Sequence, residues 1–139
     1  MFSLFKKHDT EIETLYGDLL DQSRTPKLYT DYDVPDTPHG RFQMVALHAI
    51  PYILKLEPKQ SQALYDTIFQ DIEYSFREIG VGDLAVPKKM KRYMKDFNGM
   101  IQAHAAANAN HADIARRNIF GDDGKINAKF KTYIKGLFK

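Results

Sequence analysis

Apolar side chains recur every three or four residues along most of this chain, and this spacing constrains its fold more than any other feature. It is the pattern of a helix that turns one face towards a core. No segment alternates apolar and polar residues as a half-buried strand does, and no internal repeat is present. We therefore predict an all-α fold of about five to six helices. Because 139 residues suit one domain, residues 1–139 should form a single compact unit.

Local signals mark the ends of these helices. Thr10 and Glu13 form a T-x-x-E capping box, which opens the first helix. A kink or break is expected near Pro51, because proline removes a backbone hydrogen bond. Gly80 should end the third helix and Pro87 should open the fourth. The predicted helices cover residues 10–24, 41–56, 58–79, 87 to about 105, 111–120 and 127–138, and the alanine-rich run 103–109 either continues the fourth helix or follows it. The helices within 110–139 should pack on the others.

Two local features interrupt the helical pattern. The connection 25–39 carries Pro26, Pro35 and Pro38, which are expected to exclude regular structure and leave a long ordered loop between the first two helices. Loops of this length are uncommon inside a compact domain and are often functional. In the fourth helix, Gly99 costs about 1 kcal/mol relative to alanine, so we expect it to serve a close packing contact.

Composition excludes several classes of protein. The net charge is +2 from 20 basic and 18 acidic residues, which does not indicate nucleic-acid binding, so any basic partner surface must be local. The absence of cysteine excludes disulfides and thiolate chemistry. The longest apolar stretch, 42–54, is too short to span a membrane, and it contains Pro51 and His48, the latter expected to be hydrogen-bonded in the core. Residues 1–7 lack the pattern of a signal peptide, so we expect either a cytoplasmic bacterial protein or a fragment that has already been trimmed.

No group of side chains has the pattern of a catalytic or ligand site. Asp122 and Asp123 stand beside Gly124, where a solvated turn is the simpler interpretation. His104 and His111 lie seven residues apart on one possible helical face, but two imidazoles are a weak indication of a haem or metal site. No G-x-S-x-G elbow or glycine-rich phosphate loop is present. We therefore predict no catalytic residue, no cofactor and no metal, and expect that the protein is not an enzyme.

A cluster of basic residues breaks a local rule of helix stability. Lys88 and Lys89 fall in the first turn of the predicted fourth helix, where the helix dipole favours acidic residues. Lys91, Arg92 and Lys95 follow, so this turn is either a ligand surface or a solvated face paired with acidic residues of the preceding helix. The last predicted helix is also two-sided, and its lysines either face an anionic membrane or stay in water while its apolar face docks on the core.

Two stretches of the sequence resemble a known family. The ubiquinol-cytochrome c chaperone family has a signature similar to residues 77–91, which read R-E-I-G-V-G-D-L-A-V-P-K-K-M-K. Asp71 also occupies the position of an Asp in that pattern. A second block agrees in order, with L-Y-G at 15–17, V-P-D-T at 34–37, G-R-F at 40–42 and L-H at 47–48. The resemblance extends over about residues 12–102, and R-N at 117–118 is similar to the bacterial members.

This resemblance implies an assembly chaperone for the cytochrome bc1 complex that binds newly made or apo cytochrome b. It also implies a small accessory partner and contact with the ribosome. On physical grounds, a basic face could meet either ribosomal RNA or the inner-membrane surface. We expect the client surface to combine the loop 29–41 with the turn and helix 80–95, through aromatic anchors and positive charge. The predicted client- or partner-binding residues are Tyr29, Tyr32, Asp36, Arg41, Phe42, Arg77, Asp83, Lys88, Lys91 and Arg92. Arg41, Arg77 and Asp83 have a structural alternative, in which they tie loop to helix.

Two other functions stay open from the sequence. One is a peripheral membrane or ribosome adaptor, located at the cytoplasmic membrane, that uses its basic helices and holds no client. The other is a haem-handling or metal-dependent enzyme, which requires His104 and His111 on one face of one helix. The family motifs themselves could also be wholly architectural.

Overall fold

Every regular element of the protein is a helix within the part of the chain that the structure describes. The computed structural model describes residues 6–139, with side chains from Thr10 onward; residues 1–5, on which the targeting prediction rests in part, lie outside it. The helices are α1 (Lys6–Ser23), α2 (Pro26–Thr30), α3 (Pro38–Lys55), α4 (Pro58–Glu78), α5 (Val86–Ala105), α6 (His111–Phe120) and α7 (Ala128–Leu137). The all-α prediction is confirmed. None of these seven helices is long and apolar enough to cross a membrane.

Proline opens helices in this chain rather than excluding them. Pro26, Pro38 and Pro58 are the first residues of α2, α3 and α4, and Pro87 is the second residue of α5. Proline suits these positions because the first turn of a helix needs no backbone N–H donor. The prediction that residues 25–39 hold no regular structure is therefore wrong, since α2 lies within them and α3 already begins at their end.

One further expectation about helix bounds does not hold, and of the kink or break expected near Pro51 the break is excluded. α1 begins at Lys6, so Thr10 lies inside the helix and does not cap it. No proline or glycine lies between Lys6 and Thr10, so nothing in the backbone chemistry stops the helix earlier. α3 continues through Pro51 without a break. Pro51 is buried, and packing on both sides of α3 outweighs the one hydrogen bond that proline removes.

The end of α4 follows the prediction. Gly80 has a φ of +88°, in the left-handed region that favours glycine. The Gly80 N–H donates to the carbonyl of Arg77 at 3.3 Å, and the Val81 N–H donates to the carbonyl of Phe76 at 3.0 Å. These two bonds are those of a Schellman motif, which satisfies carbonyls that the helix end leaves free. The chain therefore leaves α4 in a fixed direction.

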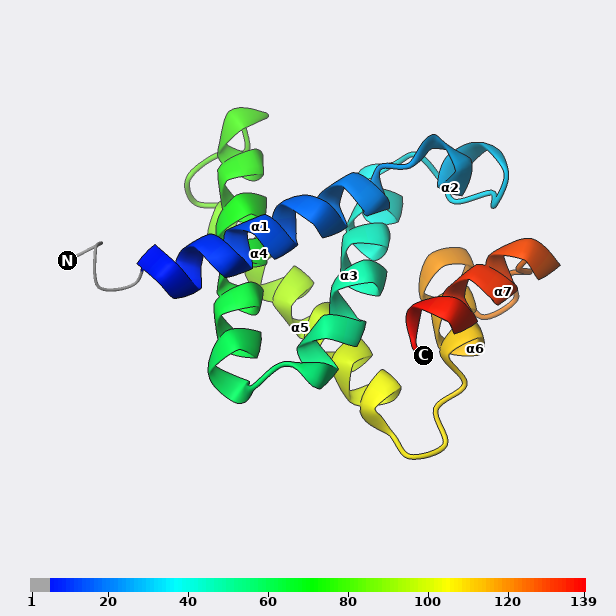
Figure 1. Ribbon diagram of the computed structural model, residues 1–139. Coiled ribbons are helices and arrows are strands. Elements are labelled where there is room, and N and C mark those ends of the chain that lie inside the picture. Colours follow the sequence, from blue (N-terminus) through cyan, green and yellow to red (C-terminus); the bar gives the residue numbers. More distant parts are fainter. Residues whose placement is uncertain (1–5) are drawn as a thin grey trace.

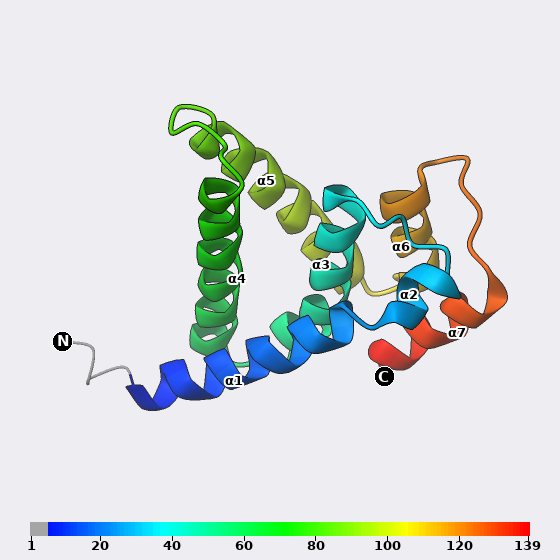
Figure 2. The same ribbon diagram turned by 90° about the horizontal axis from the view of Figure 1, so that it is seen from above.

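Helix α3 stands at the centre of the arrangement. In Figures 1 and 2, α1, α4 and α5 lie on one side of it, and α2, α6 and α7 lie on the other. Residues 42–44 and 46–51 of α3 are all buried, so these turns have almost no solvent-facing side. α3 therefore serves as a wall shared by two hydrophobic clusters.

The two clusters draw on different helices around this wall. The largest fully buried side chains of the first cluster are Leu19, Ile50, Leu64, Ile68 and Phe97. Those of the second cluster are Leu28, Met44, Phe130 and Ile134. Each such side chain contributes about 1.5–3 kcal/mol on burial. Since the first cluster needs α1, α4 and α5, and the second needs α2, α6 and α7, neither group of helices is buried without α3.

His48 is the hydrogen-bonded core histidine that the sequence predicts. It is 1% exposed. Its Nδ1 lies 2.7 Å from the carbonyl oxygen of Met44, and its Nε2 lies 2.6 Å from the hydroxyl oxygen of Tyr133. A carbonyl only accepts, so Nδ1 donates to it and Nε2 accepts from the Tyr133 hydroxyl. The imidazole thus links α3 to α7 in its neutral form.

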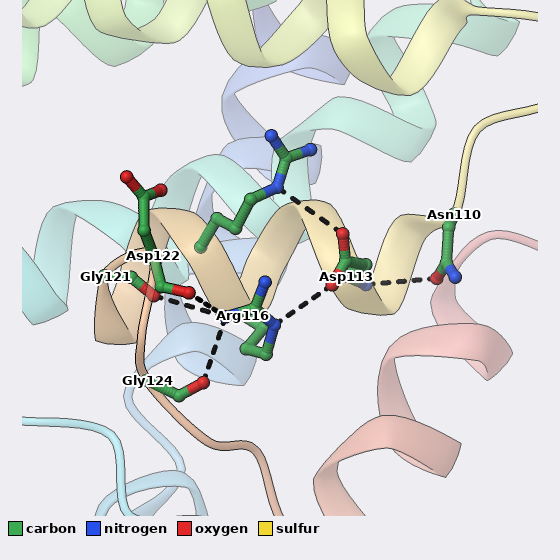
Figure 3. A network of polar contacts seen from close by, with 7 residues as sticks. Asn110, Asp113, Arg116, Gly121, Asp122 and Gly124 are labelled. Atoms are coloured by element: carbon green, nitrogen blue, oxygen red, sulfur yellow. Dashed lines mark hydrogen bonds and ion pairs between the residues drawn. The ribbon is translucent and has the colours of Figure 1, made fainter.

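Arg116 organises the connection between α6 and α7. Its Nη1 donates to the carbonyl oxygens of Gly121 at 3.3 Å, Asp122 at 2.9 Å and Gly124 at 2.9 Å, and its Nε donates to Asp113 at 3.0 Å (Figure 3). The two hydrogens of Nη1 are therefore shared among three loop carbonyls. The two adjacent aspartates of this turn are exposed, which agrees with the predicted solvated turn.

His104 and His111 lie on two helices rather than on one. His104 belongs to the last turn of α5, and His111 is the first residue of α6. Their Nδ1 atoms lie 2.9 Å apart, and the Phe138 ring stacks on both imidazoles. The haem or metal alternative required one face of one helix, and that arrangement is not present. Among residues 10–139 no group of three or more His, Asp or Glu side chains is arranged to hold a metal.

Gly40 and Gly99 have opposite surroundings. Gly99 is exposed, and an added Cβ there would meet no atom within 4 Å, so the predicted close packing contact is wrong. The glycine lies on the outer side of α5. An added Cβ at Gly40, in contrast, would lie 1.8 Å from the carbonyl oxygen of Pro35. The connection from α2 therefore passes so close to α3 that only glycine fits at this position.

Replacing these two glycines by alanine should change stability in opposite directions. Gly99→Ala should raise the free energy of unfolding by about 0.5–1 kcal/mol, because alanine is the better helix former and nothing obstructs its methyl group. Gly40→Ala should lower it by about 1–3 kcal/mol, because the methyl group forces backbone to move. Urea unfolding followed by circular dichroism measures both. Equal effects of the two substitutions would contradict this assignment.

Stability should also fall as the pH falls below about 6.5. Burial, and next the charge of His111, lower the pKa of His104 from 6.5 to about 4, and burial lowers that of His48. The unfolded chain therefore binds protons more readily, so the stabilisation is complete above pH 6.5 and is lost as the pH falls towards 4. His104 alone accounts for about 3 kcal/mol at most. In urea unfolding between pH 7.5 and 4, His104→Gln should show a smaller loss than the wild type; an equal loss would show that His104 does not titrate in this way.

Candidate functional site

A groove of about 770 Å³ lies between α1, α3 and α4. α2 and the connection that follows it form one border, and Tyr93 of α5 contributes to the lining. Its position follows from the fold, because α1 and α4 both pack against the same side of α3. We refer to it as the α1–α4 groove.

Apolar side chains form most of this lining. Phe42 of α3 is 8% exposed, and its ring makes an edge contact with Tyr93 at a centroid distance of 4.5 Å. Phe76 of α4 approaches the same Tyr93 ring at 5.4 Å. Ile72 and Ile79 continue the apolar surface along α4. Aromatic contacts of this kind hold the rings in place, so the surface of the groove is largely preformed.

One hydrogen-bonded polar pair faces into the apolar surface. The Tyr16 hydroxyl of α1 donates to a carboxylate oxygen of Asp71 on α4 at 2.5 Å. Burial raises the pKa of Tyr16, and the bond to Asp71 raises it further, so the hydroxyl stays protonated and remains a donor. A carboxylate has acceptor capacity beyond one hydroxyl. Asp71 can therefore also receive a donor from a molecule in the groove.

The connection between α2 and α3 supplies a charged rim. Arg41 Nε donates to Asp36 at 2.8 Å, and the two side chains are 68% and 62% exposed. An ion pair this exposed contributes little to stability, because solvent screens it. The Tyr29 hydroxyl donates to the carbonyl of Ser23 at 3.2 Å, and burial raises the pKa of Tyr29. The rim thus presents a hydrogen-bonded tyrosine and charges of both signs at the border of an apolar surface.

The N-terminus of α3 fixes this rim. The Thr37 hydroxyl accepts from the Gly40 N–H at 3.0 Å and caps the helix. Together with the close approach of Pro35 to Gly40, this cap sets where Asp36 and Arg41 project. The V-P-D-T and G-R-F motifs therefore build the entrance to α3.

Four of the predicted binding residues meet in the groove and one lies elsewhere. Tyr29, Asp36, Arg41 and Phe42 all line the α1–α4 groove. Tyr32 does not, because it is 6% exposed and stacks on Phe130 at 5.2 Å within the second hydrophobic cluster. Its aromatic ring packs in the core and is not available as a surface anchor.

The other five predicted residues lie at or after the turn between α4 and α5. Arg77 donates to Glu73 at 3.0 Å and to Asp83 at 2.9 Å, so it ties the turn to α4. This contact agrees with the structural alternative for Arg77 and Asp83. The basic residues Lys88, Lys91 and Arg92 are exposed on α5 and do not line the groove.

Sequence reasoning did not single out Tyr16, Asp71, Ser75 or Ile79 as site residues, although all four line the groove. Tyr16 and Asp71 fall within the motifs that resemble the family, which is the signal that could have found them. Their pairing could not be read from the sequence, because 55 positions separate them. Ile79 also lies within the motif at 77–91, whereas Ser75 follows the helical spacing of the α4 core stripe only in part, so the position of Ser75 at the edge of the groove needs the fold.

The comparisons with known proteins agree on one family. The sequence profile described as "Ubiquinol-cytochrome C chaperone" matches residues 30–133. The crystal structure of the Cbp3 homolog from Brucella abortus is similar over 99% of this chain and 86% of that chain, with 30% sequence identity and a TM-score of 0.75. No curated protein sequence matches. Since the profile spans most of the sequence, and both motifs lie in whole or in part within it, the chain belongs to the ubiquinol-cytochrome c chaperone family.

Proposed function

We propose that this protein is a non-enzymatic assembly chaperone of the cytochrome bc1 complex that holds newly made or apo cytochrome b. Membership of the ubiquinol-cytochrome c chaperone family carries the proposal. The α1–α4 groove supports it, because it is an apolar surface of about 770 Å³ that is open to a partner. A groove of this kind suits an apolar segment of a client chain better than it suits a polar metabolite.

The chemistry of the groove suggests how a client segment would be held. Phe42, Ile72 and Phe76 offer apolar contact along the segment. Asp71, already bonded to the Tyr16 hydroxyl, offers one acceptor inside this apolar surface, where a misplaced polar group is costly. This acceptor favours a client segment that carries one donor at a matching position. The groove thus distinguishes between apolar segments as well as binding them.

The charged residues of the rim contribute to client binding in a different way from the apolar groove. Asp36 and Arg41 are both more than 60% exposed, so they contribute little to folding and remain available to polar groups that flank an apolar segment. Charged groups at a rim chiefly affect the rate of association and its salt dependence. We assign apolar affinity to the groove and orientation to its rim.

Co-purification from a cell that makes a cytochrome bc1 complex tests this function. Ser75 is exposed and lines the groove, so Ser75→Trp should fill it without removing a core side chain. Gln62 is exposed on the same helix and is not part of the lining, which makes Gln62→Trp the matched control. The tagged wild type and the Gln62→Trp variant should retain cytochrome b, and Ser75→Trp should retain at least about tenfold less, which is a difference of about 1.4 kcal/mol.

Thermal unfolding of the three proteins shows whether Ser75→Trp folds normally. The same purification detects a small accessory factor or ribosomal proteins if they bind. If both variants retain as much cytochrome b as the wild type, the client surface lies outside the groove. Absence of cytochrome b from the wild type, with lipid or ribosomal proteins retained, would favour the adaptor function and reject the client-holding one.

A further inference from the structure

The turn between α4 and α5 exposes two aliphatic side chains. Leu84 is 97% exposed and Ile79 is 75% exposed, the highest values among the large hydrophobic residues in the described part of the chain. Figure 2 shows the connection projecting from the ends of α4 and α5. We refer to residues 79–85 as the α4–α5 tip. Single exposed leucines are common on protein surfaces, so exposure alone does not indicate a partner.

The tip is held in a defined conformation. The Schellman motif at Gly80 fixes its start, and Arg77 bridges to Asp83 at 2.9 Å. The Val86 N–H donates to the carbonyl of Gly82 at 3.1 Å, with the four-residue spacing of an α-helix. Residues 82–85 therefore wind into α5 as a preceding turn. Leu84 is therefore exposed in a turn whose backbone is held by hydrogen bonds.

A basic stripe continues from the tip along α5. Lys88, Lys91, Arg92 and Lys95 are exposed, and their spacing of three, four and seven residues places them on one face of the helix. Leu84 precedes Lys88 by four residues, so the winding of the turn places it at the N-terminal end of that face. The opposite face of α5 is buried through Val86, Phe97 and Met100. An apolar end and a basic face thus form one continuous surface.

The basic residues of this stripe form no ion pair within the described side chains. None of the stripe's four basic residues lies within 4.0 Å of a carboxylate among residues 10–139. The nearest acid in sequence before the stripe, Asp83, is engaged by Arg77. Lys88 moreover stands in the first turn of α5, where the helix dipole disfavours a cation. The predicted pairing with acidic residues of α4 is therefore not present in the described part of the chain, and the charge suits an anionic partner.

We infer that the α4–α5 tip and the basic stripe bind the surface of an anionic lipid bilayer, with Leu84 entering the acyl region and the stripe on lipid headgroups. Interfacial binding combines these two contributions, apolar insertion and attraction to anionic lipid. RNA suits the surface less well, because single-stranded RNA is bound by stacking on aromatic rings and the exposed side chains of the tip are aliphatic. The inference does not depend on cytochrome b.

This surface lies beside the α1–α4 groove, because Ile79 belongs to the tip and also lines the groove. A bilayer bound at the tip would therefore meet one end of the groove. Apolar client segments are most concentrated at the membrane, so such a position would bring the groove to them.

A tryptophan placed at the tip tests the inference, because the chain contains none. Leu84→Trp replaces a side chain that makes no core contact, and Thr132→Trp places the same probe on exposed α7, the other lysine-rich helix, without changing its charge. With vesicles of mixed phosphatidylcholine and phosphatidylglycerol, the fluorescence of the Leu84→Trp variant should shift to shorter wavelength, and that of the Thr132→Trp variant should not. Vesicles of phosphatidylcholine alone should give a much smaller shift.

Charge reversal supplies the second arm of the experiment. In sedimentation with the anionic vesicles, Lys88→Glu/Lys91→Glu should lower the partition coefficient at least about tenfold, and the matched Lys129→Glu/Lys135→Glu should leave it nearly unchanged. The absence of a shift for Leu84→Trp, or a shift for Thr132→Trp alone, would overturn the inference. Binding to a single-stranded RNA homopolymer without binding to vesicles would also overturn it and assign the basic stripe to RNA.

Discussion

Burial of α3 on both sides is the constraint on which the rest of the structure depends. Residues 46–51 have no solvent-facing side, so helices must pack against α3 from two directions. α1, α4 and α5 cover one side, and α2, α6 and α7 cover the other. His48 adds a polar link across the second side through Tyr133. This arrangement explains why Pro51 is tolerated, since the hydrogen bond that it removes is a small loss beside two cores.

The candidate site is a consequence of the same packing. α1 and α4 meet the same side of α3 and leave a groove between them, with Tyr16 and Asp71 joined across it. Some residues of the motifs that resemble the family set backbone positions around this groove, and others line it. Gly40 and Thr37 fix the entrance to α3, and Gly80 with Arg77 fixes the exit from α4. In the proposed function, side chains that project from these fixed points contact the client.

The sequence predicted the helices well, but it did not predict how they meet. Helical spacing, the glycine stop at Gly80 and the start at Pro87 are local signals, and each agrees with the structure. The prediction of an irregular connection at Pro26 and Pro38 was wrong, because proline is disfavoured inside a helix but favoured as its first residue. The close packing contact predicted at Gly99 was wrong, because a sequence does not show which face of a helix meets a neighbour. Of the candidate site, the rim could be predicted from its motif, whereas the burial of Tyr32 and the exposure of Leu84 depend on tertiary contacts.

Protection of a single cysteine from alkylation tests most directly whether the α1–α4 groove holds the client. The chain has no native cysteine, so Ser75→Cys in the groove and Ala128→Cys on α7 each provide one thiol at an exposed position. The rate of alkylation by a maleimide is measured for each variant, free and in complex with apo cytochrome b. The account predicts that the complex slows alkylation at position 75 at least about tenfold and leaves position 128 unchanged. Equal rates at position 75 in the free and bound protein would contradict the claim that the α1–α4 groove holds the client.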